Sequence, residues 1–139
     1  MVKKLIQQII IPLFVTALVV LLLLIEDSLK RYNYWVAFEI FLIFILPMLP
    51  IVYGYLTRDK VGAILMGVLA FAGFFGLMLF EELLSPNIST SWLNKAIPFY
   101  FILITIAGFE GYFASQRKIL TACSLCILWI LIFLLFGIH

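Results

Sequence analysis

Residues 35–56 read WVAFEIFLIFILPMLPIVYGYL and include a single charged side chain, Glu39. A helix needs about 20 mostly apolar residues to cross the hydrocarbon core of a bilayer, which is about 30 Å thick. Four other stretches have the same character, namely residues 5–25, 61–80, 96–115 and 119–138. The pattern predicts an all-α, polytopic integral membrane protein: a single domain in which five transmembrane helices form a compact bundle.

The overall composition indicates the same class of protein. Hydrophobic residues make up 66% of the 139 residues and charged residues 12%, whereas soluble domains average about 45–50% and about 25%. The net charge of +2 is too small to indicate a nucleic-acid partner. We therefore expect the lipid bilayer as the main partner of the chain, with each backbone polar group bonded inside its own helix.

The distribution of charge predicts how the bundle is oriented. Six basic residues flank the helices on the side where the first helix begins: Lys3, Lys4, Arg58, Lys60, Arg117 and Lys118. The other side has three basic residues, Lys30, Arg31 and Lys95, and four acidic ones, Glu26, Asp27, Glu81 and Glu82. The positive-inside rule then predicts a plasma-membrane protein with a cytoplasmic N-terminus and an external C-terminus. Because the connections are short, we expect successive helices to be antiparallel neighbours.

An internal match relates the second and fourth stretches. A shift of 57 residues aligns Trp35 with Trp92 and Gly54-Tyr55 with Gly111-Tyr112. The match predicts a tandem repeat of two helical hairpins, an arrangement that many transporters use. The alternative is that spanning helices share a Trp belt at one interface and a Tyr belt at the other.

Glu110 is the sharpest candidate for a functional residue. It lies within the fourth stretch, in the segment AGFEGY of residues 107–112. A carboxylate in hydrocarbon is costly unless it is protonated, is paired or faces water. One interpretation is a site for a coupled proton or cation. The other is structural, with the carboxyl bonded to a neighbouring helix or reaching the headgroups.

Three residues of the second stretch are further transport candidates. Glu39 follows Trp35 by about one turn and is expected near the outer interface. Pro47 and Pro50 lie in mid-span, where each removes a helix hydrogen bond and should kink the helix. Such a kink is either a hinge with free carbonyl groups or a static feature of packing.

Small residues predict where helices approach closely. In the third stretch these include Gly67, Gly73 and Gly76, and in the fourth they are Ala107, Gly111 and Ser115. Small residues spaced by four allow neighbouring backbones to come together. The third stretch is therefore expected to be the central helix of the bundle or a contact between copies of the chain, whereas the bulky fifth stretch is expected to face lipid.

Two short motifs have weaker implications. Cys123 and Cys126 form a CxxC pair, but thiols in an apolar cytoplasmic half are expected to be inert packing residues rather than redox centres. No His or carboxylate accompanies them, so no metal site is expected. Asn87 begins an Asn-Ile-Ser acceptor sequence for glycosylation, and its alternative is a plain polar loop.

Two functional classes follow from these features. The first is a non-catalytic integral membrane protein that forms a homo-oligomer or is a small subunit of a membrane complex. The second is a small proton- or cation-coupled transporter or channel that uses Glu110 and the kinked second helix. A membrane thiol oxidoreductase is a remote third. Familiar enzyme motifs are missing from the sequence, so neither catalytic residues nor a cofactor are expected.

Overall fold

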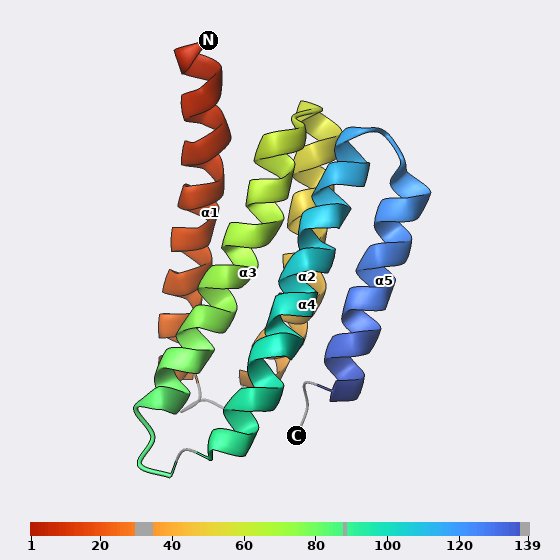
Figure 1. Ribbon diagram of the computed structural model, residues 1–139. Coiled ribbons are helices and arrows are strands. Elements are labelled where there is room, and N and C mark those ends of the chain that lie inside the picture. Colours follow the sequence, from red (N-terminus) through yellow and green to blue (C-terminus); the bar gives the residue numbers. More distant parts are fainter. Residues whose placement is uncertain (30–34, 88, 137–139) are drawn as a thin grey trace.

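The computed structural model describes residues 1–29, 35–87 and 89–136 and contains five helices in this part of the chain (Figure 1). They are α1 (Val2–Leu29), α2 (Trp35–Thr57), α3 (Lys60–Leu83), α4 (Thr90–Ser115) and α5 (Ile119–Phe136). The described residues form no strand, and each helix is long and apolar enough to cross a membrane. The predicted all-α class with five spanning helices is therefore confirmed.

Helices α1 to α4 extend beyond the predicted hydrophobic stretches. The largest difference is in α4, which begins at Thr90 rather than at residue 96. Its start is fixed by Ser89, whose hydroxyl accepts a hydrogen bond of 3.1 Å from the backbone N–H of Trp92. Such an N-cap satisfies one of the free donors at a helix start. Polar residues thus lengthen α4 past its apolar part. The end of the predicted fifth stretch, residues 137–138, lies outside the described residues.

Helices α3 and α4 form the centre of the bundle. α3 packs against α1, α2 and α4, and α4 packs against α2, α3 and α5. Neighbouring helices are antiparallel where the chain passes directly from one to the next (Figure 1). The expectation that all successive helices are neighbours is wrong for α1, which lies along α3 and has little contact with α2. Gly73 explains this pairing, because a Cβ atom there would stand 2.8 Å from Thr16 of α1.

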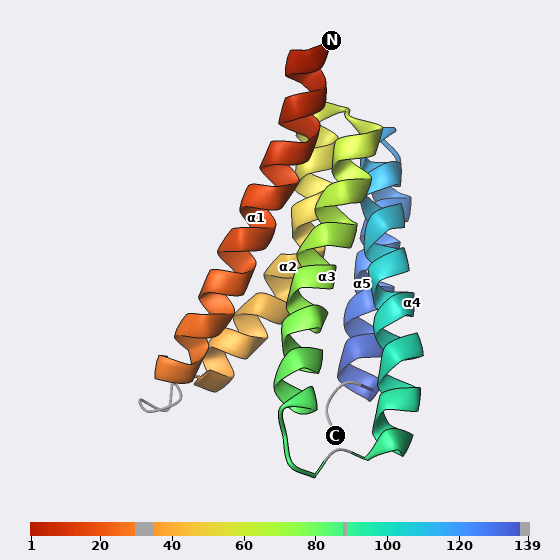
Figure 2. The ribbon, with the colours of Figure 1, turned by 60° about the vertical axis from the view of Figure 1, so that its left-hand side comes forward.

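The bundle has a narrow half and a wide half. In the half near Lys60, α3 buries small residues such as Ala63 and Gly67, whereas in the other half it buries Phe71, Phe74 and Phe75. α2 changes direction midway, so that its first half diverges from α4 and α5 (Figure 2). Small side chains therefore let the helices converge at one end, and aromatic rings fill the wider space at the other.

Trp129 of α5 is the centre of this aromatic core. Its ring lies 4.7 Å from that of Phe71 and 5.3 Å from that of Phe133, measured between centroids. Its indole N–H donates a hydrogen bond of 3.1 Å to the backbone carbonyl of Leu103 in α4. α5 thus buries one face around Trp129, while most of its residues lie on the outside of the bundle, as expected for a helix that faces lipid. A bulky apolar sequence lacks the polar contrast that would have revealed the buried side.

Candidate functional site

Glu110 lies in the narrow half of the bundle and is completely buried, with an exposed fraction of 0%. Ser115, the last residue of α4, is the fifth residue after Glu110, a distance of about 7.5 Å along the helix axis. The start of the same helix at Thr90 is about 30 Å away. The carboxyl is therefore much closer to the end of the bundle that carries Lys60 and Arg117, which we call the basic end.

Close contacts between backbones enclose this part of α4. We call them the small-residue seam, and its members are Gly54, Ala63, Gly67, Ala107, Gly111 and Ser115. A Cβ atom on Gly111 would collide with the backbone carbonyl of Ala63, and one on Gly67 with that of Ala107. A Cβ atom on Gly54 of α2 would stand only 2.7 Å from the carbonyl oxygen of Gly111 and 3.1 Å from the Cβ atom of Ala63. Three helices thus meet at van der Waals distance beside Glu110.

Neither carboxyl oxygen of Glu110 has a hydrogen-bond partner among the described residues. The buried, free thiol of Cys126 in α5 interacts electrostatically with this carboxyl. Both structural interpretations of Glu110 therefore lack support in this conformation, since the carboxyl bonds to no described part of a neighbouring helix and reaches no surface. An unpaired carboxyl in such surroundings is far cheaper to keep protonated than ionised.

The two prolines of α2 lie near the middle of the bundle and are fully buried. Pro47 and Pro50 precede the segment that carries Gly54, and the change in direction of α2 occurs in this region (Figure 2). Each proline leaves a carbonyl without its helical N–H partner. The end of α2 that packs against Gly111 and Ser115 is thus joined to the rest of the helix through a weakened stretch.

Of the remaining candidates, Cys126 is the neighbour of Glu110 described above, and the others lie elsewhere. Glu39 is exposed on the first half of α2, far from Glu110 along the bundle. Cys123 is exposed and Cys126 is buried, and both are free thiols. Asn87 is exposed in the turn between α3 and α4, next to Ile88, which lies outside the described residues. The described residues contain no group of three potential metal ligands.

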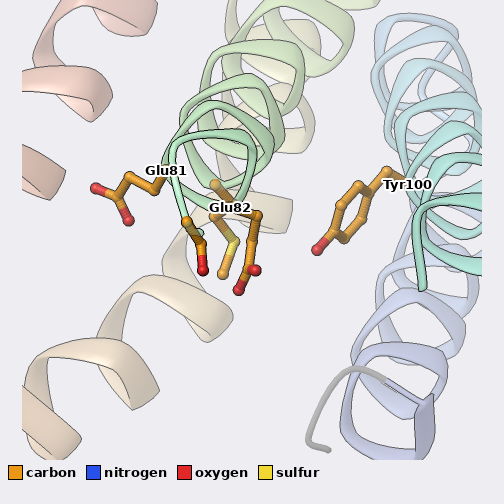
Figure 3. A pocket seen from close by; sticks show the side chains of 5 residues that line it. Glu81, Glu82 and Tyr100 are labelled. Carbon is orange, nitrogen blue, oxygen red and sulfur yellow. The ribbon is translucent and has the colours of Figure 1, made fainter. Parts of the chain in front are cut away.

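A cavity of about 220 Å³ opens at the end of the bundle opposite the basic end. Its lining residues are Met78, Glu81, Glu82, Ser85 and Tyr100. Tyr100 extends from α4 towards the end of α3, where Glu82 lies, whereas Glu81 points away (Figure 3). Tyr100 precedes Glu110 by ten residues, about 15 Å of helix, so the cavity does not give access to the buried carboxyl.

The comparisons with known proteins add no relative. The chain matches no protein-family model, no curated protein and no solved structure. The fold and the apolar exterior define the class, a five-helix multi-pass membrane protein, and Glu110 is its most unusual buried group.

Gly54 is the residue of this region whose importance is hardest to recognise in the sequence. There it stands only as part of the internal match with Gly111, yet the structure brings these two glycines into contact. The signal in the sequence that could have identified Gly54 is its alignment with Gly111 in the internal match. Parallel helices at equal depth can touch through equivalent residues. The tandem repeat itself stays a prediction.

Proposed function

We propose that the protein is a small proton-translocating membrane protein, a transporter or channel, in which Glu110 binds the proton inside the bundle. The observation that carries this proposal is the complete burial of a carboxyl whose two oxygens have no partner in the described part of the chain. Such a group contributes nothing to stability while it is ionised and unpaired. Ionisable residues within a membrane typically belong to ion pathways or proton relays.

A proton fits these surroundings better than a metal cation. Hard cations take several oxygen ligands at once, and within the described ranges Glu110 supplies two oxygens with no further polar atom bonded to them. A proton needs only the carboxyl itself. In the proposed cycle, one carboxylate oxygen of Glu110 is first protonated. The same proton is then released when the carboxyl meets water.

The basic end provides the shorter route for that exchange. In this proposal the small-residue seam blocks the route from the basic end to Glu110. Gly54, a member of the seam, belongs to the part of α2 that follows Pro50. Movement of this short segment about the two prolines would open the seam without disturbing the aromatic core. Hinges of this kind, placed at interrupted helices, are common in transporters.

Proton uptake by proteoliposomes tests the proposal. A potassium diffusion potential set with valinomycin drives protons inward, and an internal fluorescent pH dye reports them. We expect the wild-type protein to raise the initial rate clearly above that of protein-free vesicles. Glu110→Gln should return the rate to the protein-free level, because an amide of nearly the same shape cannot exchange a proton in this way.

Glu39→Gln is the matched control. It removes the other carboxyl of a spanning helix, but one that is exposed on the bundle surface, and we expect its proton uptake to equal that of the wild type. Wild-type uptake no faster than that of empty vesicles would contradict the proposal. So would an undiminished rate in Glu110→Gln.

A second candidate function, a non-catalytic subunit or homo-oligomer, is favoured by one specific observation. Gly76 of α3 has open space around its Cβ position, and Ala72, one turn earlier, is exposed. This pair is a small-xxx-small motif on the outer surface, the type of surface at which membrane helices associate. If it forms a contact between copies, mass measurement of the particle in mild detergent should give a multiple of 15.9 kDa.

Gly76→Leu should then reduce that mass to the value of a single chain. A wild-type particle with the mass of one chain would contradict a stable homo-oligomer, and co-purifying foreign subunits would favour membership of a larger complex.

We also propose an orientation for the protein: the excess of basic residues supports a cytoplasmic basic end in the plasma membrane.

A further inference from the structure

We propose that the basic end binds the headgroups of anionic phospholipids through Arg58 and Arg117. Arg58 directly follows Thr57, the last residue of α2, and Arg117 is the second residue after Ser115, the last residue of α4. These two ends are neighbours, since Gly54 of α2 lies against Gly111 and Ser115 of α4. The two arginines therefore belong to one surface rather than to separate parts of the molecule.

The backbone at both arginines is unusual. Arg58 has a φ angle of 53° and Arg117 one of 64°, and they are the non-glycine residues with positive φ in the described chain. This left-handed conformation commonly ends helices, and glycine is the residue that adopts it without steric cost. At both helix ends the chain carries a long cationic side chain where glycine would relieve that cost. The side chain is therefore expected to have a use of its own.

Aromatic rings lie beside two cations of this surface, Arg117 and Lys118. The guanidinium carbon of Arg117 lies 4.6 Å from the ring centroid of Tyr55, and its Nη1 donates a hydrogen bond of 3.5 Å to the tyrosine hydroxyl. Lys118 is placed similarly, with Nζ 5.9 Å from the ring centroid of Phe113. Tyrosine prefers the boundary between hydrocarbon and headgroups, so these positive groups are set at the depth of lipid phosphates.

The basic end has an excess of positive charge. Lys3, Lys4 and Lys60 add three more exposed cations. Asp59 is the acidic residue in the same connection, and one of its oxygens already accepts a hydrogen bond of 2.6 Å from Gln8. A planar guanidinium binds a phosphate through two parallel hydrogen bonds, and basic clusters at the membrane surface attract anionic lipids. The proposed partner of this surface is therefore the phosphate of a bilayer lipid.

Native mass spectrometry of the full chain tests this inference. The purified protein is titrated with dioleoyl phosphatidylglycerol or, separately, with dioleoyl phosphatidylcholine, and lipid adducts are counted on the intact folded particle. We expect several-fold more adducts with phosphatidylglycerol. The double variant Arg58→Gly/Arg117→Gly should lose most of this preference and should melt at no lower temperature than the wild type, because glycine suits both backbone positions.

Lys95→Gln is the control at the opposite end, and it should keep the wild-type preference for phosphatidylglycerol. Equal adduct numbers for the two lipids would overturn the inference, as would a double variant that still prefers the anionic lipid. Stabilisation of the wild-type protein by inorganic phosphate alone, equal to that given by phosphatidylglycerol, would overturn the assignment to a lipid. These outcomes are independent of proton uptake, which the inference does not require.

Discussion

Glu110 places a polar carboxyl group inside a bundle whose other buried side chains are mostly apolar. Its carboxyl is removed from water and receives no hydrogen bond from the described residues in return, although the surrounding helices are otherwise well suited to hydrocarbon. The sequence reveals such a residue easily, because a charge stands out in an apolar stretch. The sequence does not reveal whether the residue finds a partner, since that depends on which helix faces it.

Replacement of Glu110 by leucine is expected to stabilise the protein. Leucine keeps a similar volume and removes the desolvation cost of an unsatisfied polar group, which is about 1–3 kcal/mol. The free energy of unfolding, measured by titrating the detergent-solubilised protein with a denaturing detergent, should rise by about that amount while proton uptake is lost. A less stable Glu110→Leu variant would indicate that the carboxyl has a bonding role.

The two thiols provide a second test at the residue scale. Cys123 is exposed on the bundle surface and Cys126 is buried, and neither is in a disulfide. The double variant Cys123→Ser/Cys126→Ser should keep the wild-type rate of proton uptake, because the proposed cycle requires no electron transfer. A lost rate in this variant, with the fold intact by circular dichroism, would revive a redox role.

At the scale of helices, the small-residue seam determines how closely α2, α3 and α4 approach. The spacing of small residues in the sequence is enough to identify Gly67, Ala107 and Gly111 as close-packing positions. It does not distinguish Gly76, whose Cβ position is open, from Gly111, whose Cβ position is filled by the backbone of Ala63. The same residue type at the same spacing can face a neighbour or the outside, and only the helix rotation decides.

A matched pair of alanine variants tests this difference. Gly111→Ala should lower the free energy of unfolding by about 1–3 kcal/mol, the usual cost of overpacking. Gly76→Ala should leave it unchanged or raise it by about 0.5–1 kcal/mol, because alanine is the better helix former. Both are measured by the same denaturation titration. Equal losses in the two variants would contradict the seam as described.

The bend of α2 gives a further prediction for the same element. Pro47→Ala and Pro50→Ala each restore a helix hydrogen bond and should stiffen the segment of α2 that packs against Gly111 and Ser115. We expect the initial rate of proton uptake to fall in both, with the helical content kept. Pro98→Ala, which changes an exposed proline of α4, should keep the wild-type rate. An unchanged rate in both α2 variants would remove the hinge from the mechanism.

For the whole molecule, the positions of the spanning helices can be predicted from the sequence, but the way these helices pack together cannot. Each spanning helix is determined by its own length and apolarity, so all five are predictable from the sequence. The pairing of α1 with α3, through Gly73 against Thr16, depends on surfaces far apart in the chain. The buried face of α5 is equally hidden, because Trp129 sits among residues that lipid would also accept. A membrane provides no polar contrast by which inner and outer faces could be told apart.

The orientation of the molecule can be tested with single cysteines on the background Cys123→Ser/Cys126→Ser. Lys3→Cys lies at the basic end and Asn87→Cys in the turn between α3 and α4, at the other end. Because cytoplasmic connections carry the excess of Lys and Arg, we expect a membrane-impermeant maleimide added to intact cells to label position 87 and not position 3. Both positions should be labelled after the cells are opened. The reverse pattern in intact cells would overturn the positive-inside assignment and place the proposed entrance to Glu110 on the outer side.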